Sequence, residues 1–143
     1  MASRLIIAWQ AARKMRLGPE VRSYRQLIET SRAARQAIKG VSHATVVTGW
    51  DNTPRSGRRG LVLSGYNQEN FRRAIRDAIA LERANKTPLL FVKSWNEWAE
   101  GNTVEPRFEV KWSAGAVLKE VLTEELSNGK TNPQALTEVL LDG

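Results

Sequence analysis

Two glutamates, Glu97 and Glu100, lie three residues apart shortly after the apolar run Leu89–Val92, and Trp95 and Trp98 stand beside them. A pair of carboxyl groups can supply the acid and the base that break or form a glycosidic bond. Indole faces stack on sugar rings. The pattern indicates a carbohydrate site in which Glu97 and Glu100 are the candidate catalytic residues. Two plainer interpretations stay open: solvated loop acids, and tryptophans that belong to the core.

A second segment with related chemistry follows the β-branched run Ala44–Thr48. Trp50 can stack on a ring, Asp51 can bind sugar hydroxyls, and Asn52 can bind substrate or form a turn. The arginines of Arg55–Arg59 can bind phosphate, although a solvated loop is favoured for the last two. The predicted substrate-binding residues of both segments are Trp50, Asp51, Asn52, Arg55, Trp95, Asn96, Trp98 and Glu105.

Helical and strand patterns alternate along the chain, which is typical of a parallel α/β arrangement. In such folds the loops after the strands lie at one edge of the sheet, so the two segments should meet there. We expect helices from Ser23 to about Lys39, from Asn67 or Asn70 to Asn85, around Val117–Leu122 and after Asn132-Pro133, with strands at Ala44–Thr48, Leu89–Val92 and, as a third, Leu61–Leu63.

Composition excludes several classes of site and partner. The 143-residue chain has no cysteine, which excludes disulfides and thiolate metal sites, and no ligand cluster indicates a metal or a cofactor. The chain contains no apolar run of about 18 residues, so no membrane span is predicted. We expect a cytoplasmic protein. The net charge is +7, but residues 94–143 hold four basic and nine acidic side chains. Because the basic excess lies away from the candidate site, a carbohydrate or nucleotide-sugar is expected as partner ahead of nucleic acid.

At this point the sequence resembles a known family. Gly49–Arg55, Trp95–Gly101 and Glu105-Pro106 resemble the carboxyl-terminal part of the WbsX glycosyltransferase family, which is similar to the endo-α-mannosidases of glycoside hydrolase family 99. The resemblance implies a (β/α)8 barrel of the TIM type and a role in surface-polysaccharide or O-antigen synthesis, by glycosyl transfer or hydrolysis. It also implies that Glu100 is the general acid/base and that Glu97 acts as base on the 2-hydroxyl of the sugar, giving an anhydro-sugar intermediate.

The sequence departs from the family pattern in three places. Lys93-Ser94 stands where relatives have an apolar residue or alanine, Arg107 replaces an aspartate, and Phe108–Trp112 replaces a tyrosine-rich segment. The loss of the acid at Arg107 puts the local loop geometry in question.

The length of the chain limits how much of a barrel it can supply. A complete barrel takes about 250 residues, so this chain is expected to form the last third of one. We divide it into a basic helical segment at 1–22, a partial barrel domain at 23–126 and a short helical extension at 127–143. Activity would then need an amino-terminal barrel fragment on another chain, or self-association. An inactive truncated remnant and a basic nucleic-acid-binding module are the alternatives.

Overall fold

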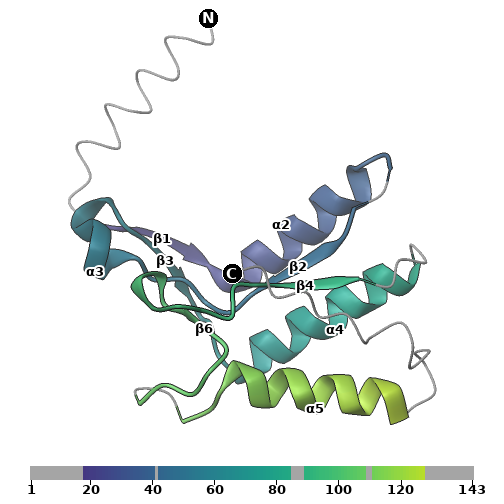
Figure 1. The fold of residues 1–143 in the computed structure, drawn as a ribbon. Coiled ribbons are helices and arrows are strands. Elements are labelled where there is room, and N and C mark those ends of the chain that lie inside the picture. The colour runs from purple at the N-terminus through teal and green to yellow at the C-terminus, as the bar shows by residue number, and fades with distance from the viewer. Residues whose placement is uncertain (1–17, 41, 85–88, 109–110, 128–143) are drawn as a thin grey trace, which may run out of the picture.

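The computed structural model describes residues 18–40, 42–84, 89–108 and 111–127 (Figure 1). Strands and helices alternate in the order expected for an α/β protein, with short irregular helices in the loops. The elements are β1 (Glu20–Ser23), α2 (Tyr24–Ala37), β2 (Ala44–Val47), α3 (Thr53–Ser56), the 3₁₀ helix η1 (Gly57–Arg59), β3 (Leu61–Ser64), α4 (Gln68–Ala84), β4 (Leu90–Lys93), β5 (Asn96–Glu97), the 3₁₀ helix η2 (Trp98–Glu100), β6 (Asn102–Thr103) and α5 (Ala114–Ser127).

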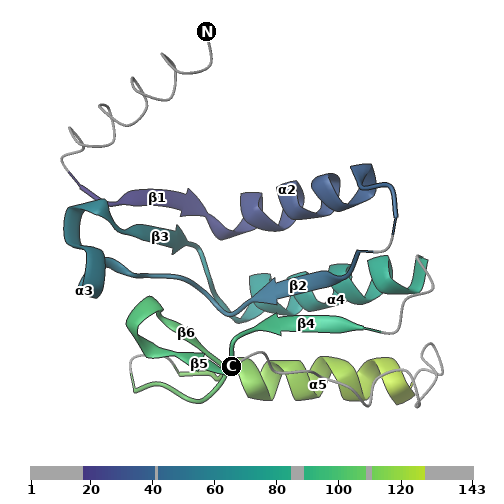
Figure 2. The same ribbon diagram turned by 45° about the horizontal axis from the view of Figure 1, so that its top comes forward.

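The strands of the described part of the chain pair two by two. β1 pairs with β3 and β2 pairs with β4, both in parallel, and β5 and β6 form an antiparallel hairpin (Figure 2). A single bridge between Asp51 and Val62 connects the segment after β2 to β3. The predicted α/β class with parallel strands is therefore confirmed, including the third strand, whereas closure into a barrel stays a prediction.

One element differs from the expected domain plan. Residues 1–22 were expected to be a helical segment, but Glu20–Ser23 form β1 because their backbone pairs with Leu61–Ser64. This pairing is made by backbone groups, and the side chain of Val21 stays exposed. Residues 1–17 and 128–143, which include the expected closing helix, lie outside the described residues.

The helix starts follow from capping side chains. Ser23 Oγ accepts a hydrogen bond from the backbone N–H of Gln26 at 3.4 Å, as predicted for the start of α2. Asn67 Oδ1 accepts one from the N–H of Asn70 at 2.9 Å, so Asn67 rather than Asn70 caps α4. α2 ends at Ala37, shortly before Gly40, whose φ of +121° suits a residue without a side chain.

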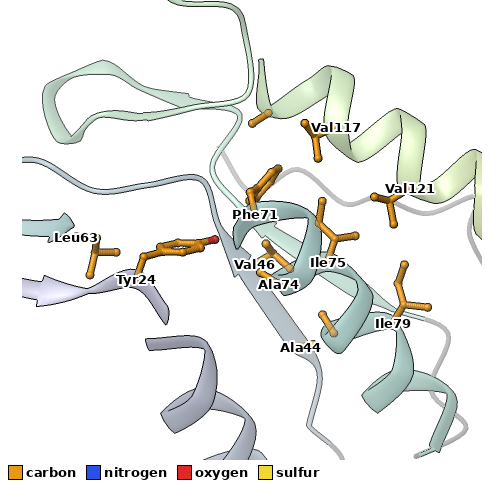
Figure 3. Close-up of a cluster of buried hydrophobic side chains, with 12 residues drawn as sticks. Tyr24, Ala44, Val46, Leu63, Phe71, Ala74, Ile75, Ile79, Val117 and Val121 are labelled. Carbon is orange, nitrogen blue, oxygen red and sulfur yellow. The ribbon is translucent and has the colours of Figure 1, made fainter. Parts of the chain in front are cut away.

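The core is built on the apolar stripe of α4. This stripe packs against β2 on one side and against α5 on the other (Figure 3). The buried residues of α4 include the five predicted from helical spacing, and Val117 and Val121 of α5 are also buried as predicted. The core residues are Tyr24, Ala44, Val46, Leu63, Phe71, Ala74, Ile75, Ala78, Ile79, Ala114, Val117 and Val121.

Tyr24 connects α2 to the end of β2. Its hydroxyl donates a hydrogen bond to the carbonyl of Val47 at 2.6 Å. The centroids of the Tyr24 and Tyr66 rings lie 5.1 Å apart in an edge-to-face arrangement. Burial raises the pKa of Tyr24 well above the ordinary value, with a smaller contribution from Tyr66. Burial also raises the pKa of Tyr66, partly offset by the charge of Arg107.

A buried ion pair closes the amino end of β2. Arg35 and Glu82 are 8% and 5% exposed, and Arg35 Nη2 lies 2.5 Å from Glu82 Oε1. The same carboxylate accepts a hydrogen bond from the N–H of Ala44, and His43 Nδ1 lies 3.5 Å from its other oxygen. His43, for which the sequence suggested no function, thus belongs to a structural cluster at the end of β2 away from the motif segments.

Candidate functional site

The segments that follow β2 and β4 meet, as predicted from the parallel arrangement. The backbone N–H of Asp51 donates to the carbonyl of Glu100 at 2.8 Å. The side-chain amide of Asn102 donates to the carbonyl of Gly49. α3 of the first segment also packs against η2 of the second. Residues that lie about fifty positions apart in the sequence therefore form one surface at the carboxyl ends of β2 and β4.

Glu100 lies in η2 and its side chain is 22% exposed. Lys93, the last residue of β4, places its Nζ 3.4 Å from Glu100 Oε2 and 2.7 Å from Asn102 Oδ1. The same ammonium group lies 4.7 Å from the centroid of the Trp50 ring, which is within the range of a cation–π contact. Glu100 is thus held at the surface by a polar group that joins both segments.

Glu97 is exposed and lies in β5, whose hairpin with β6 sets its backbone opposite Asn102. The neighbouring indoles are also at the surface, since Trp95 is 45% and Trp98 is 60% exposed. The interpretation of these two tryptophans as core residues is therefore wrong. Trp95 Nε1 donates to Glu105 Oε1 at 2.9 Å, so Glu105 orients one of the two exposed rings.

Two predicted substrate-binding asparagines stabilise the loops through their amide oxygens. Asn96 Oδ1 accepts from the backbone N–H groups of Val104 and Glu105 at 3.1 and 3.2 Å. Asn52 Oδ1 accepts from the N–H of Leu61 at 2.7 Å. Both oxygens are thus committed to the protein backbone, and substrate contact by these two residues stays a prediction.

The remaining predicted residues lie on the first segment. Asp51 is exposed, but its Oδ1 accepts from the N–H and hydroxyl of Thr53 at 2.9 and 2.6 Å. Trp50 is half-buried against the core, with Lys93 over its ring, so it forms part of the wall of the site and is less accessible for stacking than the exposed indoles. Arg55 is exposed on α3 and has no ion-pair partner within the described ranges.

Two glycines of the motifs are required by geometry. Gly49 has a φ of +87°, and a Cβ there would lie 2.7 Å from Cδ1 of Tyr66. Gly101 has a φ of +66°, and a Cβ would lie 3.2 Å from the backbone nitrogen of Asp51. A side chain at Gly49 would displace the Tyr66 ring, and one at Gly101 would push the two segments apart. Either would also strain the backbone.

Three residues that contact the candidate site were not among the predicted site residues: Lys93, Asn102 and Arg107. A lysine at the end of an otherwise apolar strand is a signal that could have identified Lys93. Arg107 donates from Nη1 to the carbonyl of Gly101 at 3.1 Å, so the replacement of the family's aspartate still leaves this side chain bonded to the motif loop. The part played by Asn102 depends on contacts that the sequence pattern does not reveal.

Other kinds of site are not found near these loops. Among the described residues, no group of three or more His, Cys, Asp or Glu side chains could hold a metal ion, and no helix is long and apolar enough to cross a membrane. A cavity of about 260 Å³ lies elsewhere, between α2, β2 and α4. This cavity is separate from the candidate site, because none of the predicted site residues lines it.

Comparison with known proteins gives one family and two curated relatives. The sequence model of the family described as Glycosyltransferase WbsX matches residues 2–115. WxcX, an uncharacterized protein of Xanthomonas campestris pv. campestris strain B100, is 33% identical over 61 residues, which cover 41% of this chain and 9% of WxcX. The WxcX protein of a second strain of this pathovar matches with the same values. The chain thus matches only a small part of the length of these relatives, and no solved structure matches it.

Proposed function

This chain belongs to the WbsX glycosyltransferase family, and on that basis we propose that it supplies the carboxyl-terminal part of a glycan-active site. The observation that carries the proposal is the meeting of the two motif segments, through the Asp51–Glu100 backbone hydrogen bond of 2.8 Å and the bond from Asn102 to Gly49. It brings a carboxylate pair, exposed indoles and an exposed arginine onto one surface. Sugar recognition needs this combination of stacking faces and polar groups.

In the proposed chemistry, Glu100 is the general acid/base and Glu97 is the second carboxylate, acting on the 2-hydroxyl of the sugar. Glu100 is the more enclosed of the two and is held by Lys93, while Glu97 is exposed and free to approach a bound sugar. Trp95 and Trp98 offer exposed ring faces for stacking. General acid–base catalysis by positioned carboxyl groups contributes about 10²–10⁴-fold in rate.

We further propose that the β2–β4 pair is part of a larger parallel sheet of the barrel type, with the domain at residues 23–126. Parallel sheets are normally covered on both faces. Here Ala44 and Val46 are buried against α4, whereas Thr45, on the opposite face of β2, is exposed. Additional strands would cover that face. The proposed source is an amino-terminal barrel portion or a second copy of this chain, acting in the cytoplasm.

Two alternatives are distinguishable from this proposal. An inactive remnant would keep the geometry of the two segments without turnover. A basic nucleic-acid-binding module would rely on the +7 net charge rather than on the carboxylates.

The test is turnover by the chain alone and by the chain co-expressed with the polypeptide encoded directly upstream. The substrates are UDP-, GDP- and TDP-linked hexoses and p-nitrophenyl α-mannoside. Turnover that requires the upstream polypeptide supports the proposal. Absence of turnover in both preparations supports the inactive remnant. Tight RNA binding supports the basic module if the logarithm of the binding constant falls with the logarithm of the salt concentration with a slope of several counterions.

A further inference from the structure

Three exposed arginines, Arg55, Arg58 and Arg59, lie on the segment formed by α3 and η1. We call residues 53–60 the arginine loop. We propose that this loop binds the diphosphate group of a sugar-diphosphate substrate next to Glu100. The sugar half of this inference rests on the proposed function, whereas diphosphate binding can be measured independently of it.

The arginine loop is closed by a specific set of contacts. Asn52 accepts hydrogen bonds at its carbonyl from the N–H groups of Arg55 and Ser56, at 3.1 and 2.8 Å. Asn52 Oδ1 also accepts a hydrogen bond from the N–H of Leu61 at 2.7 Å, and the backbone N–H of Asn52 donates one to the carbonyl of Leu61 at 3.2 Å. Asn52 therefore ties the start of the loop to its end, and the backbone that carries the arginines is fixed before any ligand binds.

Glycines make this compact loop possible. Gly57 has a φ of +51°, a conformation that side chains disfavour. At Gly60 a Cβ would lie 3.0 Å from Asn52 Oδ1 and 3.0 Å from the carbonyl of Gly57. The loop thus carries three arginines within five residues of sequence on a compact backbone. A preorganised backbone lowers the entropic cost of binding a ligand.

The arginine loop itself contains no acid. Residues 53–60 hold the three arginines and no aspartate or glutamate. Arg55 and Arg59 have no ion pair within the described ranges. In contrast, five arginines on the strands and helices have a carboxylate partner within 4 Å, whereas Arg32 of α2 has none within the described ranges: the pairs are Arg22 with Glu20, Arg25 with Glu29, Arg72 with Glu120, Arg73 with Asp77, and Arg76 with Glu124.

The arginine loop lies next to the candidate catalytic carboxylate, where it could bind the anionic part of a sugar substrate. α3 packs against η2, which carries Glu100, so the arginine loop borders the candidate catalytic carboxylate. A sugar whose ring reaches Glu100 would place a linked diphosphate beside these cations. Arginine binds phosphate oxygens through paired N–H donors, which suits this group better than a neutral glycan. A diphosphate site would favour glycosyl transfer over hydrolysis.

The experiment is isothermal titration calorimetry of the full chain with inorganic pyrophosphate, UDP and geranyl diphosphate. The variant is Arg55→Ala/Arg58→Ala/Arg59→Ala, and the matched control is Arg32→Ala. Arg32 is an exposed arginine of α2 that also has no ion pair within the described ranges. We expect the triple variant to bind pyrophosphate about 30-fold more weakly and the control to bind it like the parent chain.

Tighter binding of UDP than of pyrophosphate indicates a nucleotide-linked sugar, and tighter binding of geranyl diphosphate indicates a lipid-linked one; both support the proposal. Equal binding by the triple variant and the parent overturns it. So does binding of RNA in preference to all three diphosphates. Circular dichroism of the triple variant checks that it is folded. If pyrophosphate binds through the loop but no sugar is turned over, this inference stands and the proposed function fails.

Discussion

Asn102 is the side chain whose removal should separate the two motif segments. It is fully buried, it donates to the carbonyl of Gly49, and it accepts from Lys93 Nζ at 2.7 Å. Asn102→Ala leaves a buried carbonyl without its donor, which costs about 1–3 kcal/mol, and removes a charge-assisted hydrogen bond. Because Lys93 is partly exposed, water can replace part of the hydrogen bond that its ammonium group loses. We expect a total destabilisation of about 3 kcal/mol.

The assay is urea unfolding followed by tryptophan fluorescence. With a slope of about 2 kcal/mol per M, the midpoint should fall by about 1.5 M. Asn67→Ala is the matched control, because Asn67 is an exposed helix cap whose loss costs about 1 kcal/mol. Asn102→Asp keeps the acceptor for Lys93 but turns an oxygen toward the carbonyl of Gly49, so it should lose at least as much stability as the alanine variant. If Asn102→Ala costs no more than Asn67→Ala, the reasoning is refuted.

Three further predictions concern stability. Gly101→Ala should cost about 1–2 kcal/mol in the same unfolding assay, because its φ is +66° and the new Cβ meets a backbone nitrogen at 3.2 Å. Gly18→Ala, with open space around it, should be nearly neutral. Equal destabilisation by the two variants would contradict the backbone strain at Gly101. Glu82→Gln should cost about 3 kcal/mol because it leaves the charge of Arg35 buried without its partner. The control Glu29→Gln, in an exposed ion pair, should cost less than about 1 kcal/mol. A cost at Glu82 as small as that at Glu29 would contradict a stabilising role of the buried ion pair. Burial raises the pKa of both tyrosines, so the unfolded chain loses their protons first and stability should fall as the pH rises above about 10; tyrosinate absorbance at pH 10 in the folded protein would contradict this.

The parts of the fold set by local pattern could be predicted from the sequence. The stripe from Phe71 to Ile79 has helical spacing, and it is buried in α4. Ser23 is a capping residue in front of an amphipathic run, and it caps α2. The two motif segments each follow an apolar strand, and parallel pairing of β2 with β4 brings them together.

The parts set by long-range contacts could not be predicted in this way. β1 has an exposed valine and two charged residues, so only its backbone pairing with β3 makes it a strand. Trp50 and Trp98 share one residue type, yet one is half-buried and the other is 60% exposed, because the surroundings of each side chain decide its burial. Likewise, the role of Asn102 depends on Gly49, which is distant in sequence.

The central claim is that Glu100 performs acid–base chemistry on a glycan at the surface where the two segments meet. The measurement that tests it most directly is the turnover rate of Glu100→Gln against the parent, in the preparation that contains the upstream polypeptide, with Glu29→Gln as a control for an exposed glutamate on α2. We expect a loss of about 10²-fold or more for Glu100→Gln and an unchanged rate for the control. A Glu100→Gln variant that turns over substrate as fast as the parent would contradict it.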